Sequence, residues 1–156
     1  MSDVRHSALL AASARVSSLL TRARALSLFL FSGCSANMST AELEPQLSSV
    51  ENGVYAGWCA VEGHAAVFKT VLSVGWNPHF EGTKKTVEPH VLHTFDEDFY
   101  GAEMRLLIVG YIRPQEKYSS LDELIAAIDA DIECGRTALD EPAHAALQSD
   151  PSLIFA

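Results

Sequence analysis

The stretch EMRLLIVGYI, residues 103–112, decides the fold class of this chain because its apolar side chains recur at every second position. Met104, Leu106 and Ile108 fall on one face of an extended chain, as in a β-strand that turns one face toward a core. Pro114 follows shortly and ends the pattern, because proline has no amide hydrogen to donate to a sheet. The pattern predicts a strand over residues 103–112.

Three further strands are predicted upstream of this stretch. Residues 53–61, GVYAGWCAV, and residues 67–76, VFKTVLSVGW, are rich in β-forming side chains, and a short turn that contains Gly63 separates them. Residues 87–95 alternate in character and give the third candidate. Residues 33–52 are predicted to be a loop, since small and turn-forming residues dominate them.

One amphipathic helix is predicted downstream. Ser120 and Glu123 form a capping box, in which the serine hydroxyl accepts from the Glu123 amide and the glutamate returns a bond. Apolar residues then recur at helical spacing, at Leu121, Leu124, Ile125, Ile128 and Ile132. We expect this stripe to pack on the sheet, with the acidic residues, Asp131 among them, on the polar side. Pro142 limits the helix, and a short polar tail is predicted after it.

The order of these elements indicates a mainly β protein. Strands come first and one helix comes last, without the βαβ alternation of a parallel nucleotide-binding sheet. A small antiparallel barrel covered by a C-terminal helix is the expected architecture, because closure removes exposed strand edges. With 156 residues and a hydrophobic fraction of 48%, the chain is long enough for one such domain, predicted over residues 33–156.

Residues 1–32 differ in composition from the rest and are predicted to be an N-terminal extension, helical or without fixed structure. They are rich in Ser, Ala, Leu and Arg and nearly free of acidic residues, as in an organelle transit peptide. The alternative is a segment that does not belong to the functional protein. The apolar run over residues 25–31 is far shorter than the roughly 20 residues that span a bilayer. We expect a cytoplasmic protein, or a mitochondrial one if the transit peptide is genuine.

The charge distribution excludes one class of partner. Residues 1–40 carry a balance of +3, whereas residues 41–156 carry 7 basic and 19 acidic residues, a balance of −12. An acidic body argues against nucleic-acid binding, which depends on Lys and Arg meeting phosphates. The three cysteines, Cys34, Cys59 and Cys134, form no close pair in the sequence, which favours a reducing compartment over a disulfide framework.

The candidate chemistry lies in residues 75–101, GWNPHFEGTKKTVEPHVLHTFDEDFYG, which hold three His and two Lys between predicted strands. Strand alternation puts Glu88 and His90 on one face, where the carboxylate could remove a proton from a hydroxyl group. The alternative is a solvated strand face with incidental charges. Zinc binding by Glu88, His90 and His93 is disfavoured, because His93 falls on the other face.

A cationic turn precedes Glu88. Residues 82–86, GTKKT, are similar to the end of a phosphate-binding loop but lack the full pattern, since no glycine directly precedes a Lys-Ser or Lys-Thr pair. The turn could hold a polyphosphate, or it could simply be a solvated connection. Residues 96–98, DED, could bind a cation or face solvent.

Six short segments of the sequence resemble the eukaryotic riboflavin kinase family, both in their order and in their spacing. They are GVYAGW (53–58), SVGWNPHF (73–80), TKKTVEPHVLH (83–93), FDEDFYG (95–101), LLIVGYIRP (106–114) and SLDELIAAIDAD (120–131). The resemblance implies a six-stranded antiparallel Greek-key barrel with a C-terminal α-helix. It also implies transfer of the γ-phosphate of ATP to the 5′-hydroxyl of riboflavin by a monomer, with Mg²⁺, or Zn²⁺ in its place, giving FMN and ADP.

The resemblance also implies a role for individual residues. Glu88 matches the base that takes the hydroxyl proton. The positions that match the nucleotide site are Ser35, His90, His93 and Tyr100, those that match the flavin site are Arg113, Glu116 and Ser120, and those that match the metal site are Ser35 and Asn37.

Two departures from the family pattern lie near the N-terminus. The family has a first strand and a Gly-rich basic flap, and nothing like them is expected before Gly33. The Pro-Thr-Ala-Asn motif is replaced by CSAN over residues 34–37, where Ser35 and Asn37 keep oxygen donors. The sequence therefore predicts a riboflavin kinase with an intact acceptor half, including Glu88, and a compromised nucleotide half that lacks the phosphate flap. The alternative is a catalytically impaired flavin-binding or interaction module of the same fold.

Overall fold

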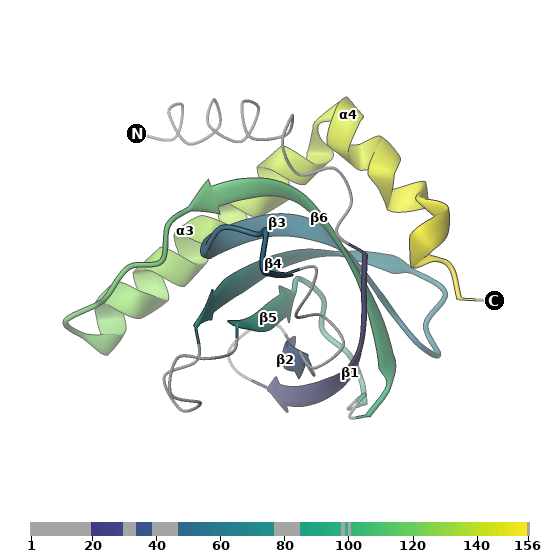
Figure 1. Cartoon of the computed structure of the whole chain (residues 1–156), viewed down its shortest axis with the longest axis horizontal. Helices are drawn as coiled ribbons and strands as arrows, with labels where there is room; N and C mark the ends of the chain where they lie inside the picture. Colours follow the sequence, from purple (N-terminus) through teal and green to yellow (C-terminus); the bar gives the residue numbers. More distant parts are fainter. Residues whose placement is uncertain are drawn as a thin grey trace.

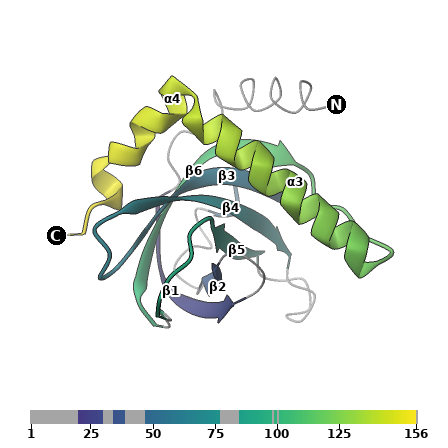
Figure 2. The ribbon, with the colours of Figure 1, turned by 180° about the vertical axis from the view of Figure 1, so that it is seen from behind.

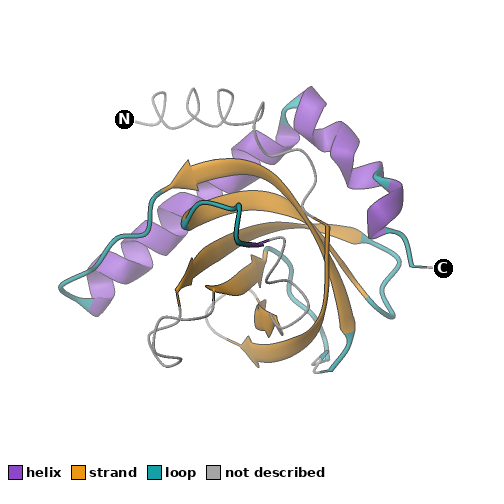
Figure 3. Cartoon of the chain, in the orientation of Figure 1, coloured by secondary structure: helices purple, strands orange, loops and turns teal. Residues whose placement is uncertain are grey.

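The computed structural model describes residues 20–29, 34–38, 47–76, 85–97, 99 and 101–155, and describes the first two ranges as strands without their side chains. The strands are β1 Leu20–Phe29, β2 Cys34–Met38, β3 Gly53–Val61, β4 Val67–Trp76, β5 Lys85–Val91 and β6 Glu103–Arg113. All neighbouring pairs are antiparallel, in the order β1-β2-β5-β4-β3-β6, and β1 pairs with β6 to give a closed barrel (Figures 1 and 3). The β2–β5 pairing extends over two residue pairs.

Four predicted strands are confirmed. Residues 53–61 and 67–76 form the β3–β4 hairpin, whose turn holds Gly63 at a φ of 86°, a value that favours glycine. Residues 103–112 lie within β6. The strand predicted over residues 87–95 is β5, but β5 begins two residues earlier and ends at Val91. It ends there because the chain then turns and buries Phe95 in the barrel.

Two expectations about the N-terminal part are wrong. Residues 20–29 were expected to be helical or without fixed structure, and they form the strand β1. Residues 34–38 were expected to be loop, and they form β2. Residues 25–29 of β1 pair with β2 and residues 20–24 pair with β6, and such pairing overrides the helical preference of Ala, Leu and Arg. A strand therefore does precede Gly33, and the sheet includes part of the predicted extension.

The barrel interior holds the larger hydrophobic cluster, here called the interior core. It is built from the alternate positions that the period of two predicts, among them Tyr55, Leu72, Val87, Val91, Met104, Leu106 and Ile108. The confirmed inward face of β6 shows that the period-two pattern identifies the core side correctly. The intervening residues of β3 are also buried, because a second layer covers the outside of the sheet.

That second layer is the helix α3, Leu121–Asp140, which crosses the outer face of β3 and β4 (Figures 1 and 2). Its second half packs through Ala138 and Leu139. Gly135 faces the sheet, and a Cβ atom there would make ordinary van der Waals contacts with Val71 at 3.6 Å and Ala56 at 3.8 Å. In the described part of the chain, neither α3 nor any other helix is long and apolar enough to cross a bilayer.

The residues after Pro142 are not the predicted polar tail. They form α4 Pro142–Ala145 and two 3₁₀ turns, η2 Ala146–Ser149 and η3 Pro151–Leu153. His144 and Leu153 are buried, and the indole Nε1 of Trp58 donates to the His144 carbonyl at 2.9 Å. The prediction failed because each segment is too short to show a periodic pattern, whereas contacts with distant strands hold them in place.

Candidate active site

One row of cross-strand neighbours connects the two ends of the candidate site. Glu88 on β5 pairs with Ser73 on β4, Ser73 pairs with Val54 on β3, and Val54 pairs with Arg113 at the end of β6. Three interstrand steps around the curved sheet separate Glu88 from Arg113. The predicted base and the first predicted flavin residue therefore belong to one row of neighbours but lie three strands apart in the six-stranded barrel.

Glu88 points out of the barrel. It is exposed, whereas Val87 and Pro89 on either side are buried, and Val87 belongs to the interior core. No described side chain forms a hydrogen bond or an ion pair with its carboxylate. Glu88 is therefore an accessible proton acceptor on the outer face.

His90 lies two residues farther along β5, on the same outward side as Glu88, as the alternation predicts. It is half-buried, and this burial lowers its pKa, so the imidazole is neutral at pH 7. The Thr70 hydroxyl donates to the His90 carbonyl at 2.9 Å and fixes the strand. The backbone of Ser35 is the register partner of His90 on β2, so two predicted nucleotide-site positions are neighbours.

His93 lies apart from Glu88, beyond the end of β5. Its ring stacks on Phe68 with centroids 4.5 Å apart and meets Phe95 edge-on at 4.9 Å. The rings of His93 and Phe95 line a hollow of about 740 Å³, whose lining also includes Glu62, His64, Asp96 and Phe99. Tyr100, also predicted for the nucleotide site, lies outside the described residues.

The predicted metal ligands cannot be placed as side chains. Ser35 and Asn37 lie in β2, which is described as a strand only. Within the ranges that the structure describes, no group of three or more His, Cys, Asp or Glu side chains gathers as a metal site.

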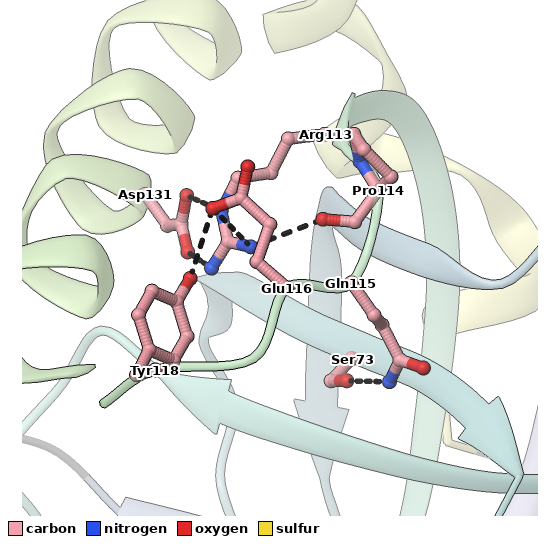
Figure 4. A network of polar contacts seen from close by, with 7 residues as sticks. All are labelled: Ser73, Arg113, Pro114, Gln115, Glu116, Tyr118 and Asp131. Atoms are coloured by element: carbon pink, nitrogen blue, oxygen red, sulfur yellow. Dashed lines mark hydrogen bonds and ion pairs between the residues drawn. The ribbon is translucent and has the colours of Figure 1, made fainter. Parts of the chain in front are cut away.

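Arg113 is held by a buried carboxylate on α3 (Figure 4). Its Nε donates to Asp131 Oδ1 at 2.8 Å and its Nη2 to Asp131 Oδ2 at 2.6 Å. The hydrogen bond to Asp131 raises the pKa of Arg113. Asp131 was expected on the polar side of the helix, and this is wrong: it is 4% exposed, because Arg113 neutralises it at the helix–sheet contact.

The linker between β6 and α3, residues 114–120, surrounds this ion pair (Figure 4). Glu116 lies 3.8 Å from Arg113 Nη1, and the Tyr118 hydroxyl donates to the Glu116 carboxylate at 3.3 Å. Gln115 Nε2 donates to the Ser73 hydroxyl at 3.0 Å. The linker thus contacts the residue that is the direct neighbour of Glu88 on the sheet.

Ser120 is the N-cap of α3, as predicted, and its Oγ accepts from the Glu123 amide at 3.2 Å. The returning half of the capping box differs. The Glu123 carboxylate accepts from the amide and the hydroxyl of Ser119, at 3.0 and 2.8 Å, and these bonds lower the pKa of Glu123. The helix start is thereby fixed close to Glu116, which is predicted for the flavin site.

The apolar stripe of α3 is only half covered, which corrects the expectation that all of it packs on the sheet. Leu121 is 69% exposed, Ile128 is 41% exposed, and Leu124 and Ile125 are each 37% exposed. The first turns of α3 extend past the edge of the sheet (Figures 1 and 2). Burying such side chains is worth roughly 1.5–3 kcal/mol each, so the partly uncovered group of four is a candidate contact surface.

The cationic turn contributes one described lysine, and it has a structural role. Lys85 Nζ donates to the carbonyls of Leu47 at 3.2 Å and Val50 at 2.5 Å, and it lies 5.4 Å from the centre of the Trp76 ring. These contacts hold the 47–50 turn against β5. Residues 82–84 lie outside the described ranges.

Comparisons with known proteins identify the family and support the fold. Residues 32–139 match the Flavokinase family, described as riboflavin kinase. The chain is 50% identical over 118 residues to a bifunctional riboflavin kinase/FMN phosphatase of Arabidopsis thaliana, covering 76% of this chain and 31% of that protein. It is 47% identical over 103 residues to a riboflavin kinase of Mus musculus, covering 66% of each chain. The crystal structure of riboflavin kinase from Trypanosoma brucei superposes with a TM-score of 0.67 at 26% identity, covering 83% of this chain and 82% of that one.

Proposed function

Because the chain belongs to the riboflavin kinase family, we propose that it transfers the γ-phosphate of ATP to the 5′-hydroxyl of riboflavin, giving FMN and ADP. The observation that carries this proposal is the row from Arg113 to Glu88 across the outer face of the sheet. It connects a fixed cation on β6 to an accessible carboxylate on β5 through Val54 and Ser73.

The flavin ring is assigned to the Arg113 end of the row. Leu124, Ile125 and Ile128 offer an uncovered apolar wall to a flat tricyclic ring. Polar groups at the edge of this wall come from Arg113 at the end of β6 and Glu116 in the linker. The ribityl chain then extends across Ser73 toward β5. This orientation brings the terminal hydroxyl, and no ring atom, to the base.

We assign Glu88 the role of general base, which accepts the proton of the 5′-hydroxyl group. As the 5′-oxygen attacks the γ-phosphorus, the bond between that phosphorus and the leaving oxygen of ADP breaks, and the hydroxyl proton passes to the Glu88 carboxylate. The exposed position of Glu88 and the absence of a described ion-pair partner leave both oxygens available. Little covalent chemistry is required beyond this transfer, so alignment of the two substrates supplies most of the rate enhancement.

The nucleotide is assigned to the other side of Glu88, along β5 toward His93. His90 and the backbone of Ser35 lie between them, and the rings of His93 and Phe95 border the hollow beyond. Ser35 and Asn37 fit Mg²⁺, since a hydroxyl and an amide carbonyl are oxygen donors of the kind that it prefers and β2 runs beside the strand of Glu88. When bound, Mg²⁺ neutralises charge on the transferring phosphate.

The direct test is FMN formation by the purified full chain with riboflavin, ATP and Mg²⁺. We expect FMN to appear and to require both ATP and native protein, so heat-denatured protein and a reaction without ATP serve as controls. No FMN above these controls would reject the kinase activity. Quenched flavin fluorescence without FMN would instead support a flavin-binding module of the same fold.

A further inference from the structure

Asp131 is the one buried acidic residue in the described part of the chain, and nothing above gives it a contact with a substrate. It lies where α3 passes from its uncovered first half to its packed second half. Both of its carboxylate oxygens bind Arg113. Taking two charges out of water costs free energy that pairing only partly offsets, so a buried ion pair is weak grounds for a purely stabilising role.

The Arg113–Asp131 ion pair joins the two ends of a chain segment, residues 114–130, here called the hoop. Arg113 is the last residue of β6, and Asp131 follows 18 residues later. Between them lie the linker and the uncovered first turns of α3, and residues 114–117 are exposed. The pair is therefore the tether that sets where this exposed hoop lies relative to the sheet, together with the bond from Gln115 to Ser73.

The other contacts of Arg113 organise the linker. Its Nη1 donates to the Pro114 carbonyl at 3.0 Å and lies 3.8 Å from Glu116, and its Cζ lies 5.8 Å from the centre of the Tyr118 ring. A guanidinium that is fixed by two parallel bonds directs its remaining N–H groups along fixed lines. The orientation of both Arg113 and Glu116 thus depends on the carboxylate behind them.

We propose that Asp131 is a positioning residue for riboflavin: it orients Arg113, and through Arg113 the linker residue Glu116, toward the flavin ring. This inference rests on the proposed function, because Arg113 and Glu116 are the proposed flavin contacts. Asp131 itself touches neither substrate, so its effect falls on flavin affinity and not on the use of ATP.

The test replaces Asp131 by asparagine, which keeps the size of the side chain and removes its charge. We expect Asp131→Asn to raise the Kd for riboflavin about tenfold, as measured by quenching of flavin fluorescence. A change of this size corresponds to the loss of one hydrogen bond to a charged group. The KM for ATP changes by less than about twofold. Asp129→Asn is the matched control, since Asp129 is exposed on the same helix and loses the same charge.

A double-mutant cycle separates positioning from general stability. In an Arg113→Ala background, Asp131→Asn adds no further loss of riboflavin affinity if it acts through Arg113. If Asp131→Asn does not fold, Asp131→Glu decides the matter, because it keeps the charge and only displaces the guanidinium. We expect a smaller rise in the riboflavin Kd for that variant.

Two results would overturn the positioning role: wild-type riboflavin affinity in the folded variant, or an equal loss of ATP and riboflavin affinity. Failure of the proposed function gives a different pattern. A wild-type chain that binds riboflavin without making FMN, with binding still weakened by Asp131→Asn, rejects the kinase and supports the positioning role. A wild-type chain that binds no riboflavin overturns both.

Discussion

Two carboxylates of the candidate site, Glu88 and Asp131, differ in exposure to solvent, and we propose different roles for them on that ground. Glu88 is exposed and has no ion-pair partner among the described side chains, so it can exchange a proton with a substrate. Asp131 is buried against Arg113, so its charge is already engaged. In the proposed mechanism, a carboxylate is therefore the proton acceptor on β5, and a second carboxylate holds Arg113 in place.

Replacement of Glu88 by glutamine tests the first task. We expect Glu88→Gln to lower kcat about 100-fold or more, because the amide cannot take the hydroxyl proton, with the melting temperature unchanged at this exposed site. FMN formation under saturating riboflavin and ATP is the measurement. Glu133→Gln, an exposed position on α3, controls for the loss of one charge, and near-normal turnover of Glu88→Gln would remove the base from the mechanism.

Tyr55 gives a residue-level prediction about pH and stability. Burial in the interior core, with smaller contributions from Tyr111 and Glu51, raises its pKa from 10.0 to about 12. The folded chain therefore keeps a proton that the unfolded chain loses, so the stabilising contribution is complete below pH 10 and is lost as the pH rises toward 12.

Urea unfolding over this alkaline range measures the effect. Tyr55→Phe should flatten the decline in the free energy of unfolding between pH 10 and pH 12. It should also lower stability at neutral pH by about 1 kcal/mol, since the hydroxyl donates to the Glu51 carbonyl at 2.6 Å. An unchanged slope in the variant would show that another group controls the decline.

At the scale of elements, the apolar stripe of α3 is continuous, but its two halves have different surroundings. Its second half covers the outer face of β3 and β4, and its first half leaves large apolar side chains uncovered beside the linker. The spacing of apolar residues is the same in both halves. This spacing shows which side of the helix is apolar, and it does not show whether another element covers that side. The sheet edge determines which part of that side is covered.

A lysine on the uncovered half tests its role. Ile125→Lys should weaken riboflavin binding at least about tenfold, because a charge enters the apolar wall, while the free energy of unfolding changes by about 0.5 kcal/mol or less. Ala130→Lys is the control, since Ala130 is exposed on the opposite side of α3. A large fall in melting temperature with Ile125→Lys would show that the stripe packs within the protein and not on a ligand.

At the scale of the whole molecule, β1 joins the two ends of the sheet. It pairs with β2 over residues 25–29 and with β6 over residues 20–24. The strand that carries the candidate base, β5, and the strand that ends at Arg113, β6, are thereby parts of one ring. Removal of β1 would leave two edges open to water or to other chains.

Paired deletions test this connection. Deletion of residues 1–29 should lower the melting temperature by about 10 °C or more, or cause aggregation, because it removes both ladders of β1. Deletion of residues 1–19 leaves every described strand in place and is the control. Equal melting temperatures for the two truncated chains would show that β1 contributes nothing to the barrel.

The sequence by itself determined the central strands, the core side of β6, the start of α3 at Ser120 and the shared face of Glu88 and His90. These features depend on residues that are close in the sequence, because both strand alternation and helix capping involve residues only a few positions apart. The resemblance supplied the family. Its individual site assignments remain predictions, and those at Tyr100 and at the side chains of Ser35 and Asn37 lie outside the described structure.

Only the tertiary structure decided that residues 20–29 form a strand, that Asp131 is buried, that half of the α3 stripe is uncovered and that His144 and Leu153 pack on the barrel. Each of these depends on a partner far along the chain: β6 for β1, Arg113 for Asp131, Trp58 for His144. Local preference cannot specify such partners, because the free energy that selects them appears only when distant segments meet.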